Sequence, residues 1–363
     1  MILTIAEIAD IHFGALLTNT MNLYDHLCKY FIERLKSEKP DIIAICGDLF
    51  HMKLSLSSTE AILCNKFINE LIKTFPDTLI ILIRGTCSHD LNQLDNYMCL
   101  ASDKFRIYNT VTTDVYKGFK YLVIPEEYVK KDTYKEYLAD KYDWVFFHGM
   151  FTFAGNYAAM QGASNRTTFT TSDFENIVSG KVVGGHIHIP LTKDKVQYCG
   201  SFERWKFGEE EPKGFRLHRY DTEKKKVVHD EFIPNEGALV YKTIKYSDID
   251  SSTMEALSKA IESNISSSSD KLRITISASD SVPTENMDNL IAVCSQYNSV
   301  KLFKDKKLDS AANIERDAKE EENRANRISE YNGLDFYQIT IKFAKDNLNV
   351  IVTDKQIDKA LNE

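Results

Sequence analysis

Five short apolar runs in this chain each end abruptly in a histidine or an aspartate. The runs, each with the polar residues that follow it, are Ile2–Ala9 with Asp10 and His12, Asp41–Cys46 with Asp48 and His51, Thr78–Ile83 with His89 and Asp90, Trp144–Phe147 with His148, and Lys181–Val183 with His186 and His188. Short β-rich runs bounded by glycine and polar residues predict buried strands. Because ligands of α/β sheets gather at the carboxyl ends of strands, the sequence predicts one sheet edge that collects imidazoles and carboxylates.

The polar residues at these run ends are of the kind that bind divalent cations. Carboxylates and imidazoles without thiolates suit Mn²⁺, Fe²⁺ or Zn²⁺. Asp10 and His12 are two residues apart, so on an extended strand end their side chains point the same way. His186 and His188 repeat this spacing, and Asp48, on a tight turn after a glycine, can offer one oxygen to each of two cations. A single such pair is more often an ordinary polar contact, but five in order predict a dinuclear metal site.

A dinuclear site predicts phosphoester hydrolysis. Two cations about 3.5–4 Å apart clamp the attacking and leaving oxygens of the displacement, and they convert water to hydroxide near neutral pH. The net charge of −8 argues against a protein that holds nucleic acid by overall basicity. It does not exclude a nucleic-acid enzyme, because bound cations change the charge at the site itself.

Cysteine usage and the missing targeting signals indicate a reducing compartment. The seven cysteines are odd in number and show no CxxC spacing, so we expect free thiols rather than disulfides or a cysteine–zinc site. We find no signal peptide and no transmembrane run, and we expect a cytoplasmic protein that does not contact a membrane. No GxxxxGK[ST] loop occurs, so we do not expect ATP to be bound by that device.

The pattern of elements predicts two domains and a tail. Residues 1–233 alternate strand and helix signals, with helices predicted over Thr20–Glu38 and from a capping box at Ser57 and Glu60. A further strand, Tyr121–Ile124, ends in a proline and is expected to bring no ligand. Residues 238–347 predict a smaller α+β domain, and residues 348–363 predict a tail with a short helix that contacts a partner. The strands expected in the second domain are Leu239–Tyr246, Leu272–Ala278, Val300–Phe303 and Phe336–Ala344, and the helices are one opened by Ser252 and Glu255, one near Thr284–Gln296, and a charged one at Ile314–Ser329.

The ordered motifs resemble the calcineurin-like metallophosphoesterases, whose pattern is Asp-x-His, Gly-Asp, Gly-Asn-His-Asp, His and Gly-His-x-His. Within that family the chain is similar to the SbcD-type nuclease subunits. Its Gly-Asp motif continues to His51 and lacks the Asp-Arg-Gly of the serine/threonine phosphatases. The segment Gly200–Arg204, with Phe207–Glu209 and Lys213–Phe215 after it, is also similar to those nucleases. The resemblance implies a four-layer α/β/β/α sandwich with a smaller C-terminal α+β cap that binds DNA.

The resemblance also assigns roles to the residues that match its motifs. It implies that one cation is held by Asp10, His12, Asp48 and His188, and the other by Asp48, His148 and His186. It makes His89 the catalytic histidine that protonates the departing oxygen, with Asp90 orienting it, and it places His51 against the scissile nucleotide. We further expect Arg204, Tyr157 and Arg166 to contact DNA.

The chain departs from the family at one ligand. Where the family has Gly-Asn-His-Asp, this chain has a loop two residues longer, with Ser88 in the place of the asparagine that ligates the second cation. Ser88, Thr86, a backbone carbonyl or a water could fill that position, and a hydroxyl is a poorer ligand than an amide, so a weaker second site is expected. The longer loop resembles phage-encoded relatives, which favours a bacteriophage origin.

The function that the resemblance implies is a Mn²⁺-dependent DNA nuclease, with Mg²⁺ or Fe²⁺ as other candidate cations. It implies 3′→5′ exonuclease action on duplex ends and endonuclease action on single strands and hairpins, in DNA recombination and repair. It also implies a homodimer through the two N-terminal helices and an SbcC-like SMC-type coiled-coil ATPase partner, in a bacterial or phage-infected cytoplasm. Two alternatives are a small-molecule phosphodiesterase or phosphatase on the same scaffold, and a binding scaffold with weakened catalysis.

Overall fold

The computed structural model describes most of the first 305 residues. The described ranges are 1–15, 20–90, 92–127, 129–154, 167–246, 251–264, 271–277, 284–296 and 300–305, with Ile341 and Thr353. The strand predicted at Phe336–Ala344, the helix predicted at Ile314–Ser329 and the predicted tail helix therefore lie outside the described residues. In the described part of the chain, no helix combines the length and the apolar run needed to cross a bilayer.

Two six-stranded sheets form the body of the chain. In the first, the order is β14-β13-β1-β2-β3-β4, and β1 to β4 are parallel neighbours. Its strands are β1 (Ile2–Ile8), β2 (Ile42–Cys46), β3 (Leu79–Ile83), β4 (Phe105–Tyr108), β13 (Gly214–Asp221) and β14 (Lys226–Pro234). The register places Ile5 beside Ile42, and Ile42 beside Leu79. The predicted runs at the N-terminus are therefore adjacent parallel strands.

The second sheet has the order β11-β12-β10-β7-β6-β5 and is parallel from β6 through β12. Its strands are β5 (Thr112–Tyr116), β6 (Phe119–Ile124), β7 (Trp144–His148), β10 (Val182–Gly185), β11 (Leu191–Lys193) and β12 (Val196–Tyr198). A separate pair joins β8 (Met150–Phe151) to β9 (Thr168–Phe169). Parallel strands buried on both faces have nearly continuous apolar sequences, which is why β2, β3 and β7 stood out.

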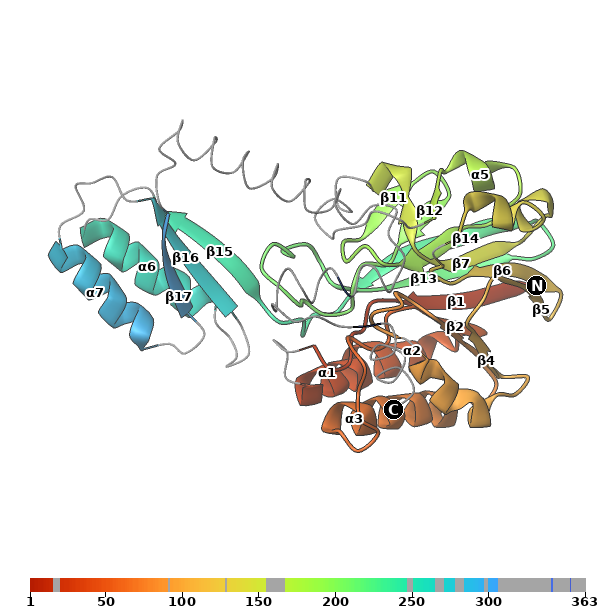
Figure 1. Ribbon diagram of the computed structural model, residues 1–363, viewed down its shortest axis with the longest axis horizontal. Helices are drawn as coiled ribbons and strands as arrows, with labels where there is room; N and C mark the ends of the chain where they lie inside the picture. The colour runs from red at the N-terminus through yellow and green to blue at the C-terminus, as the bar shows by residue number, and fades with distance from the viewer. Residues whose placement is uncertain are drawn as a thin grey trace. The chain divides into compact units, whose positions relative to one another are not determined.

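The sheets and helices stack in four layers (Figure 1). The N-terminal helices and α3 (Thr59–Thr74) pack their apolar faces on the first sheet, with Phe31, Phe67 and Leu71 fully buried. A second core lies between the two sheets, and a third covers the outer face of the second sheet beneath short 3₁₀ turns and α5 (Ser172–Glu175). This arrangement confirms the predicted α/β fold.

The N-terminal helical segment covers the predicted range but is not uniform. It consists of α1 (Thr20–His26), a π-helical turn, η1 (Leu27–Ile32), and α2 (Glu33–Glu38), and Lys39 ends it in the left-handed conformation. The helix predicted to open at Ser57 instead has Ser58 as its N-cap, with the Ser58 hydroxyl accepting from the Ala61 N–H. The predicted capping box was therefore wrong by one residue, because neighbouring serines offer the same capping chemistry.

The segment beyond Pro234 forms a smaller α/β unit. Its strands β15 (Tyr241–Tyr246), β16 (Lys271–Ser277) and β17 (Val300–Asp305) make one sheet, with β15 and β16 parallel. The helices α6 (Ser251–Asn264) and α7 (Thr284–Ser295) occupy the two predicted helical stretches. The secondary structure predicted for these residues is present. The predicted domain boundaries stay a prediction.

A buried charged network joins the two sheets. The His218 imidazole on β13 lies 2.9 Å from Glu7 on β1, 3.1 Å from Asp230 on β14 and 2.8 Å from the Gln197 amide on β12. Burial alone would lower the pKa of His218, but Glu7 and Asp230 outweigh it, so the pKa is raised. A raised folded pKa stabilises the protein fully below the unfolded value of about 6.5, and this stabilisation is lost as pH rises through the folded pKa.

We therefore expect Glu7→Gln/His218→Gln to remove a pH dependence of stability. The free energy of unfolding of the wild type minus that of the double variant should fall by up to about 1.4 kcal/mol per pH unit above pH about 6.5. Urea denaturation from pH 6 to 9 measures this difference. His229→Gln, at a half-exposed histidine on β14, should leave the slope unchanged. Parallel curves for the wild type and the double variant would show that His218 is neutral in the folded protein.

Candidate metal centre

Six predicted site residues meet where the parallel strands of both sheets end. The structure groups them in two sets, and within each set the potential ligand atoms lie within 4.8 Å of one another. The sets are Asp10, His12 and His188, which follow β1 and β10, and Asp48, His148 and His186, which lie at the ends of β2, β7 and β10. Residues 176 positions apart in the chain, such as His12 and His188, therefore become neighbours.

Asp48 lies between the two sets. Its Oδ2 is 3.4 Å from His148 Nε2 in one set and 3.9 Å from His12 Nε2 in the other. The Nε2 atoms of His12 and His188 are only 3.1 Å apart and converge on one point. Facing imidazole and carboxylate donors of this kind fit a pair of divalent cations that share one carboxylate.

The backbone at this edge is strained. Asp10, His12, Asp48 and His186 all have positive φ angles, of 52°, 55°, 51° and 95°. Such conformations are uncommon for residues other than glycine, cost about 1–3 kcal/mol each and cluster at functional sites. Gly47 is required beside them, because a Cβ there would lie 2.1 Å from the His148 ring. The strain turns each chain segment sharply enough to aim its side chain into the site.

An outer layer of hydrogen bonds orients the imidazoles. His148 Nδ1 donates to the Cys46 carbonyl at 2.8 Å, which turns Nε2 toward Asp48. His188 Nδ1 contacts Glu209 at 2.8 Å, and the Glu209 carboxylate is itself held by Lys213 and by the Trp205 N–H. Outer partners of this kind fix the tautomer and raise the basicity of a ligating histidine. The Gly200–Phe215 segment thus supports the centre from behind.

His51 and His89 extend the first set. Their rings stack at 5.2 Å between centroids, and both rings lie within 5.3 Å of the His12 ring. His89 Nδ1 donates to the His51 carbonyl, so its Nε2 is the atom left to exchange a proton. Both side chains are half-buried, which leaves them open to a bound molecule. Burial, with the neighbouring His89, lowers the pKa of His51.

The predicted role of Asp90 is wrong. Rather than orienting the His89 imidazole, the Asp90 carboxylate accepts from the backbone N–H groups of Asp48, Phe50 and Gly85, at 3.1, 3.0 and 2.7 Å. Burial and the neighbouring Asp48 raise its pKa to about 7 in spite of these bonds. Asp90 therefore holds the Asp48 loop against the His89 loop, and it acts on the site through the backbone.

The longer loop places Thr86, and not Ser88, beside the second set. The Ser88 side chain is exposed, whereas Thr86 is buried. The Thr86 hydroxyl lies 3.3 Å from Asp48 Oδ2, 3.5 Å from His148 Nε2 and 3.4 Å from His186 Nδ1. Its backbone N–H also donates to Asp48 Oδ1 at 2.6 Å. Of the two hydroxyls named from the sequence, only that of Thr86 is positioned to replace the missing amide.

The sequence analysis missed one carboxylate at the centre. Glu126 comes two residues after β6, the strand that was expected to bring no ligand, and that expectation was wrong. The residue is 3% exposed, and its Oε2 lies 2.7 Å from the Thr86 hydroxyl, 3.5 Å from His186 Nδ1 and 3.9 Å from His148 Nε2. The signal was present in the sequence, because Glu126 is a polar residue directly after an apolar run, but no family motif marks it.

Charges at the centre compensate one another. Burial would raise the pKa of Asp48, but the imidazoles of His148 and His12 lower it well below its usual range. Burial would likewise lower the pKa of His148, but Asp48, Asp10 and Glu126 raise it to about 10. For Asp10, burial dominates and raises the pKa. The centre therefore concentrates buried negative charge that needs positive partners.

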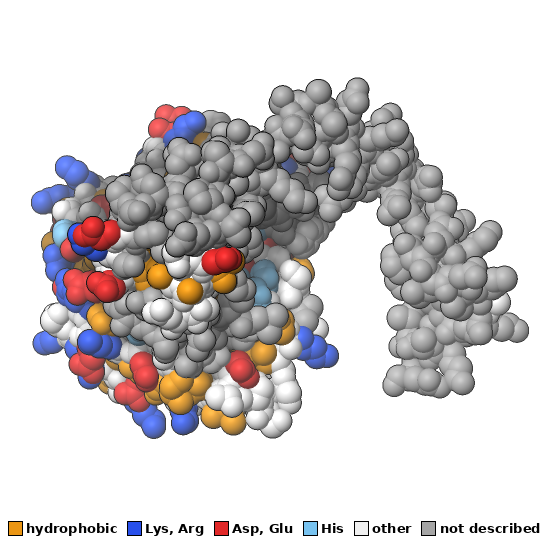
Figure 2. Space-filling model, turned by 90° about the vertical axis from the view of Figure 1, so that its left-hand side faces the viewer, with side chains coloured by type: hydrophobic (Ala, Val, Ile, Leu, Met, Phe, Trp, Pro, Cys, Tyr) orange, Lys and Arg blue, Asp and Glu red, His pale blue; other side chains and the backbone are white. Residues whose placement is uncertain are grey.

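The residues predicted to bind DNA are placed differently. The Arg204 guanidinium donates to four backbone carbonyls, those of Glu209, Glu210, Glu211 and Leu239. These bonds use four of its five donors, so Arg204 holds this loop and is poorly placed to bind a phosphate. Tyr157 and Arg166 lie outside the described residues. On the face shown in Figure 2, acidic and basic side chains are interspersed and histidine side chains also reach the surface.

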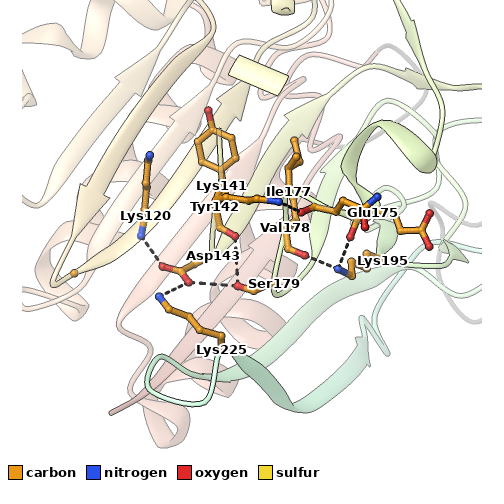
Figure 3. A pocket seen from close by; sticks show the side chains of 12 residues that line it. Lys120, Lys141, Tyr142, Asp143, Glu175, Ile177, Val178, Ser179, Lys195 and Lys225 are labelled. Atoms are coloured by element: carbon orange, nitrogen blue, oxygen red, sulfur yellow. Dashed lines mark hydrogen bonds and ion pairs between the residues drawn. The ribbon is translucent and has the colours of Figure 1, made fainter. Parts of the chain in front are cut away.

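A cavity of about 500 Å³ lies at the other end of the second sheet, where β6, β7, β10 and β12 begin (Figure 3). Four lysines line it, Lys120, Lys141, Lys195 and Lys225. Each is bonded to a carboxylate or a backbone carbonyl, as between Lys225 and Asp143 at 2.6 Å. The cavity is therefore internally neutralised and separate from the metal centre.

Comparison with known proteins agrees with this geometry. The model of the family described as calcineurin-like phosphoesterase matches residues 3–222. A protein of Staphylococcus saprophyticus, named as the SbcD component of the nuclease SbcCD, is 24% identical over 263 residues, which cover 63% of this chain and 68% of that protein. Among solved structures, GAP50, the anchor in the inner membrane complex of Plasmodium, is 14% identical with a TM-score of 0.37, over 64% of this chain and 89% of its own. That structural likeness is too small to support an inference about activity.

Proposed function

This chain belongs to the calcineurin-like phosphoesterase family, and on that basis we propose that it is a metal-dependent nuclease that hydrolyses DNA phosphodiester bonds. The observation that carries the proposal is the meeting of two donor sets around Asp48, with His51 and His89 beside the first. The similarity to a protein named as a nuclease component supports DNA as the substrate. We propose Mn²⁺ as the cation, because carboxylate and imidazole donors without thiolate suit it.

The side chains have distinct tasks in this mechanism. A pair of divalent cations, when bound, supplies Lewis acidity toward a phosphate oxygen and lowers the pKa of water. Asp10, His12 and His188 would hold one cation, His148 and His186 the other, and Asp48 both. His89, with Nδ1 tied to the His51 carbonyl, delivers a proton from Nε2 to the departing oxygen. His51 contacts the nucleotide on the open side of His12.

The finer features of the proposal come from the family resemblance. We propose 3′→5′ exonuclease action on duplex ends and endonuclease action on single strands and hairpins, in DNA recombination and repair. We further propose a nuclease domain over residues 1–233, a DNA-binding cap over residues 238–347, a homodimer through the N-terminal helices and an SbcC-like ATPase partner. Handling of ATP by the partner is compatible with the absence of a phosphate loop from this sequence.

The proposal is tested by presenting three substrates to the purified chain with Mn²⁺ and with EDTA. The substrates are a labelled linear duplex with a hairpin end, an aryl phosphate and a cyclic nucleotide. We expect Mn²⁺-dependent shortening of the duplex and opening of the hairpin, and no cleavage with EDTA. Cleavage of the small esters alone would instead establish a small-molecule phosphodiesterase, and no hydrolysis of any substrate would establish a binding scaffold.

A further inference from the structure

Glu126 occupies the second donor set as closely as its recognised members do. β6 is parallel to β7 with Ile124 beside Phe147, so Glu126 and His148 leave the same sheet edge on adjacent strands. The Glu126 backbone N–H bonds to the Arg84 carbonyl at 3.4 Å, which ties it to the loop that carries Thr86. Its position is therefore set by two neighbouring strands and not by a free loop.

The distances around Glu126 are those of atoms that share one cation. Two ligands of an octahedral cation at about 2.1 Å lie about 3 Å apart when adjacent and about 4.2 Å apart when opposite. Glu126 Oε2 lies 2.7 Å from the Thr86 hydroxyl, 3.5 Å from His186 Nδ1 and 3.9 Å from His148 Nε2. His148 Nε2 is in turn 3.4 Å from Asp48 Oδ2. All four separations fall within or close to that range.

The charge argument leads to the same conclusion. A carboxylate that is 3% exposed is costly to bury unless a cation or hydrogen-bond donors compensate it. The second set without Glu126 has one carboxylate, which it shares with the first. With Glu126 it has two, together with two imidazoles and a hydroxyl, and such a set suits a hard divalent cation.

We propose that Glu126 is a direct ligand of the second cation and that, with the Thr86 hydroxyl beside it, it replaces the amide ligand of the family pattern. The carboxylate adds a negative charge that an amide lacks, so the second site binds its cation firmly and the weakening expected from the sequence does not occur. This inference rests on the proposed two-cation centre but not on DNA as the substrate.

Diffraction from crystals of the full chain soaked in Mn²⁺ tests the assignment directly. We expect two anomalous peaks, with a Glu126 carboxylate oxygen about 2.2 Å from the peak beside His148 and His186. Two peaks with both Glu126 oxygens beyond about 3 Å would overturn the assignment and leave the two-cation function intact. A single peak or none would overturn both.

Binding measurements give an independent readout. Glu126→Gln preserves shape and should weaken the second Mn²⁺ in equilibrium dialysis by more than the roughly 10–100-fold that loss of an outer partner costs, with the first unchanged. The control is Glu127→Gln, the adjacent glutamate, whose carboxylate accepts from the Tyr134 hydroxyl outside the centre. It should bind both ions as the wild type does. Unchanged affinity of Glu126→Gln for the second ion, with circular dichroism showing a native fold, would refute the assignment.

Discussion

Replacing Asp48 with asparagine is expected to abolish Mn²⁺-dependent DNA cleavage. Asp48 is the carboxylate nearest to both donor sets, with its Oδ2 at 3.4 Å from His148 and 3.9 Å from His12. An amide keeps the shape but removes the charge and one of the two acceptor oxygens, so it cannot bridge two cations. Loss of a single charge-stabilising donor costs about 10²–10³ in kcat, and we expect at least the upper end, because both ions are affected.

The Asp48→Asn experiment needs separate readouts for rate and binding. Single-turnover cleavage of a labelled duplex gives the rate, and equilibrium dialysis with Mn²⁺ gives the stoichiometry, which should fall below that of the wild type. Asp103→Asn, at an exposed aspartate in the loop before β4, should change neither. If Asp48→Asn kept more than about 10% of the wild-type rate with both ions bound, the bridging role would be wrong.

Replacing His89 with glutamine is expected to slow DNA cleavage about 10²–10⁴-fold while both cations remain bound. His89 is held by the His51 carbonyl, and its Nε2 is the atom available to protonate the departing oxygen. An aryl phosphodiester releases a phenolate that needs no proton, so the variant should hydrolyse it at nearly the wild-type rate. The comparison of kcat on DNA and on the aryl ester therefore isolates proton transfer from metal binding.

Two outcomes would contradict this role for His89. Equal losses on DNA and on the aryl ester would show that the residue does not act as an acid. Loss of a bound Mn²⁺ would make it a ligand, which its place in a third cluster with His12 and His51 allows geometrically. His229→Gln is the matched control, since that imidazole is paired with Glu231 on β14 at 3.0 Å, away from the centre.

Strand ends and their donors could be predicted from local sequence, but loop paths could not. The apolar runs before Asp10, Asp48 and His148 are long enough to identify strands, and the structure places each residue at the expected end. Ser88 and Thr86 carry the same hydroxyl chemistry, and only the path of their loop makes one exposed and the other buried. Nothing in residue type or spacing distinguishes them, because loop conformation depends on what packs against it.

The same limit applies to charged residues whose partners are distant in sequence. Asp90 is adjacent to His89 in the chain, yet its carboxylate binds backbone N–H groups some forty positions away. Arg204 has the residue type of a phosphate ligand, yet four carbonyls of its own surroundings hold it. A side chain's role follows from which donors and acceptors surround it after folding, and sequence adjacency does not define that set.

For this protein, the amino-acid order alone determined the α/β fold, the sheet edge that collects the imidazoles and carboxylates, and the family. These follow from hydrophobic periodicity and from short motifs, both of which act over a few residues. Only the tertiary structure placed Glu126 and Thr86 at the second donor set and removed Asp90 and Arg204 from their expected contacts. The physical reason is that a cation selects ligands by distance, within a few ångströms, and strands far apart in the chain bring those ligands together.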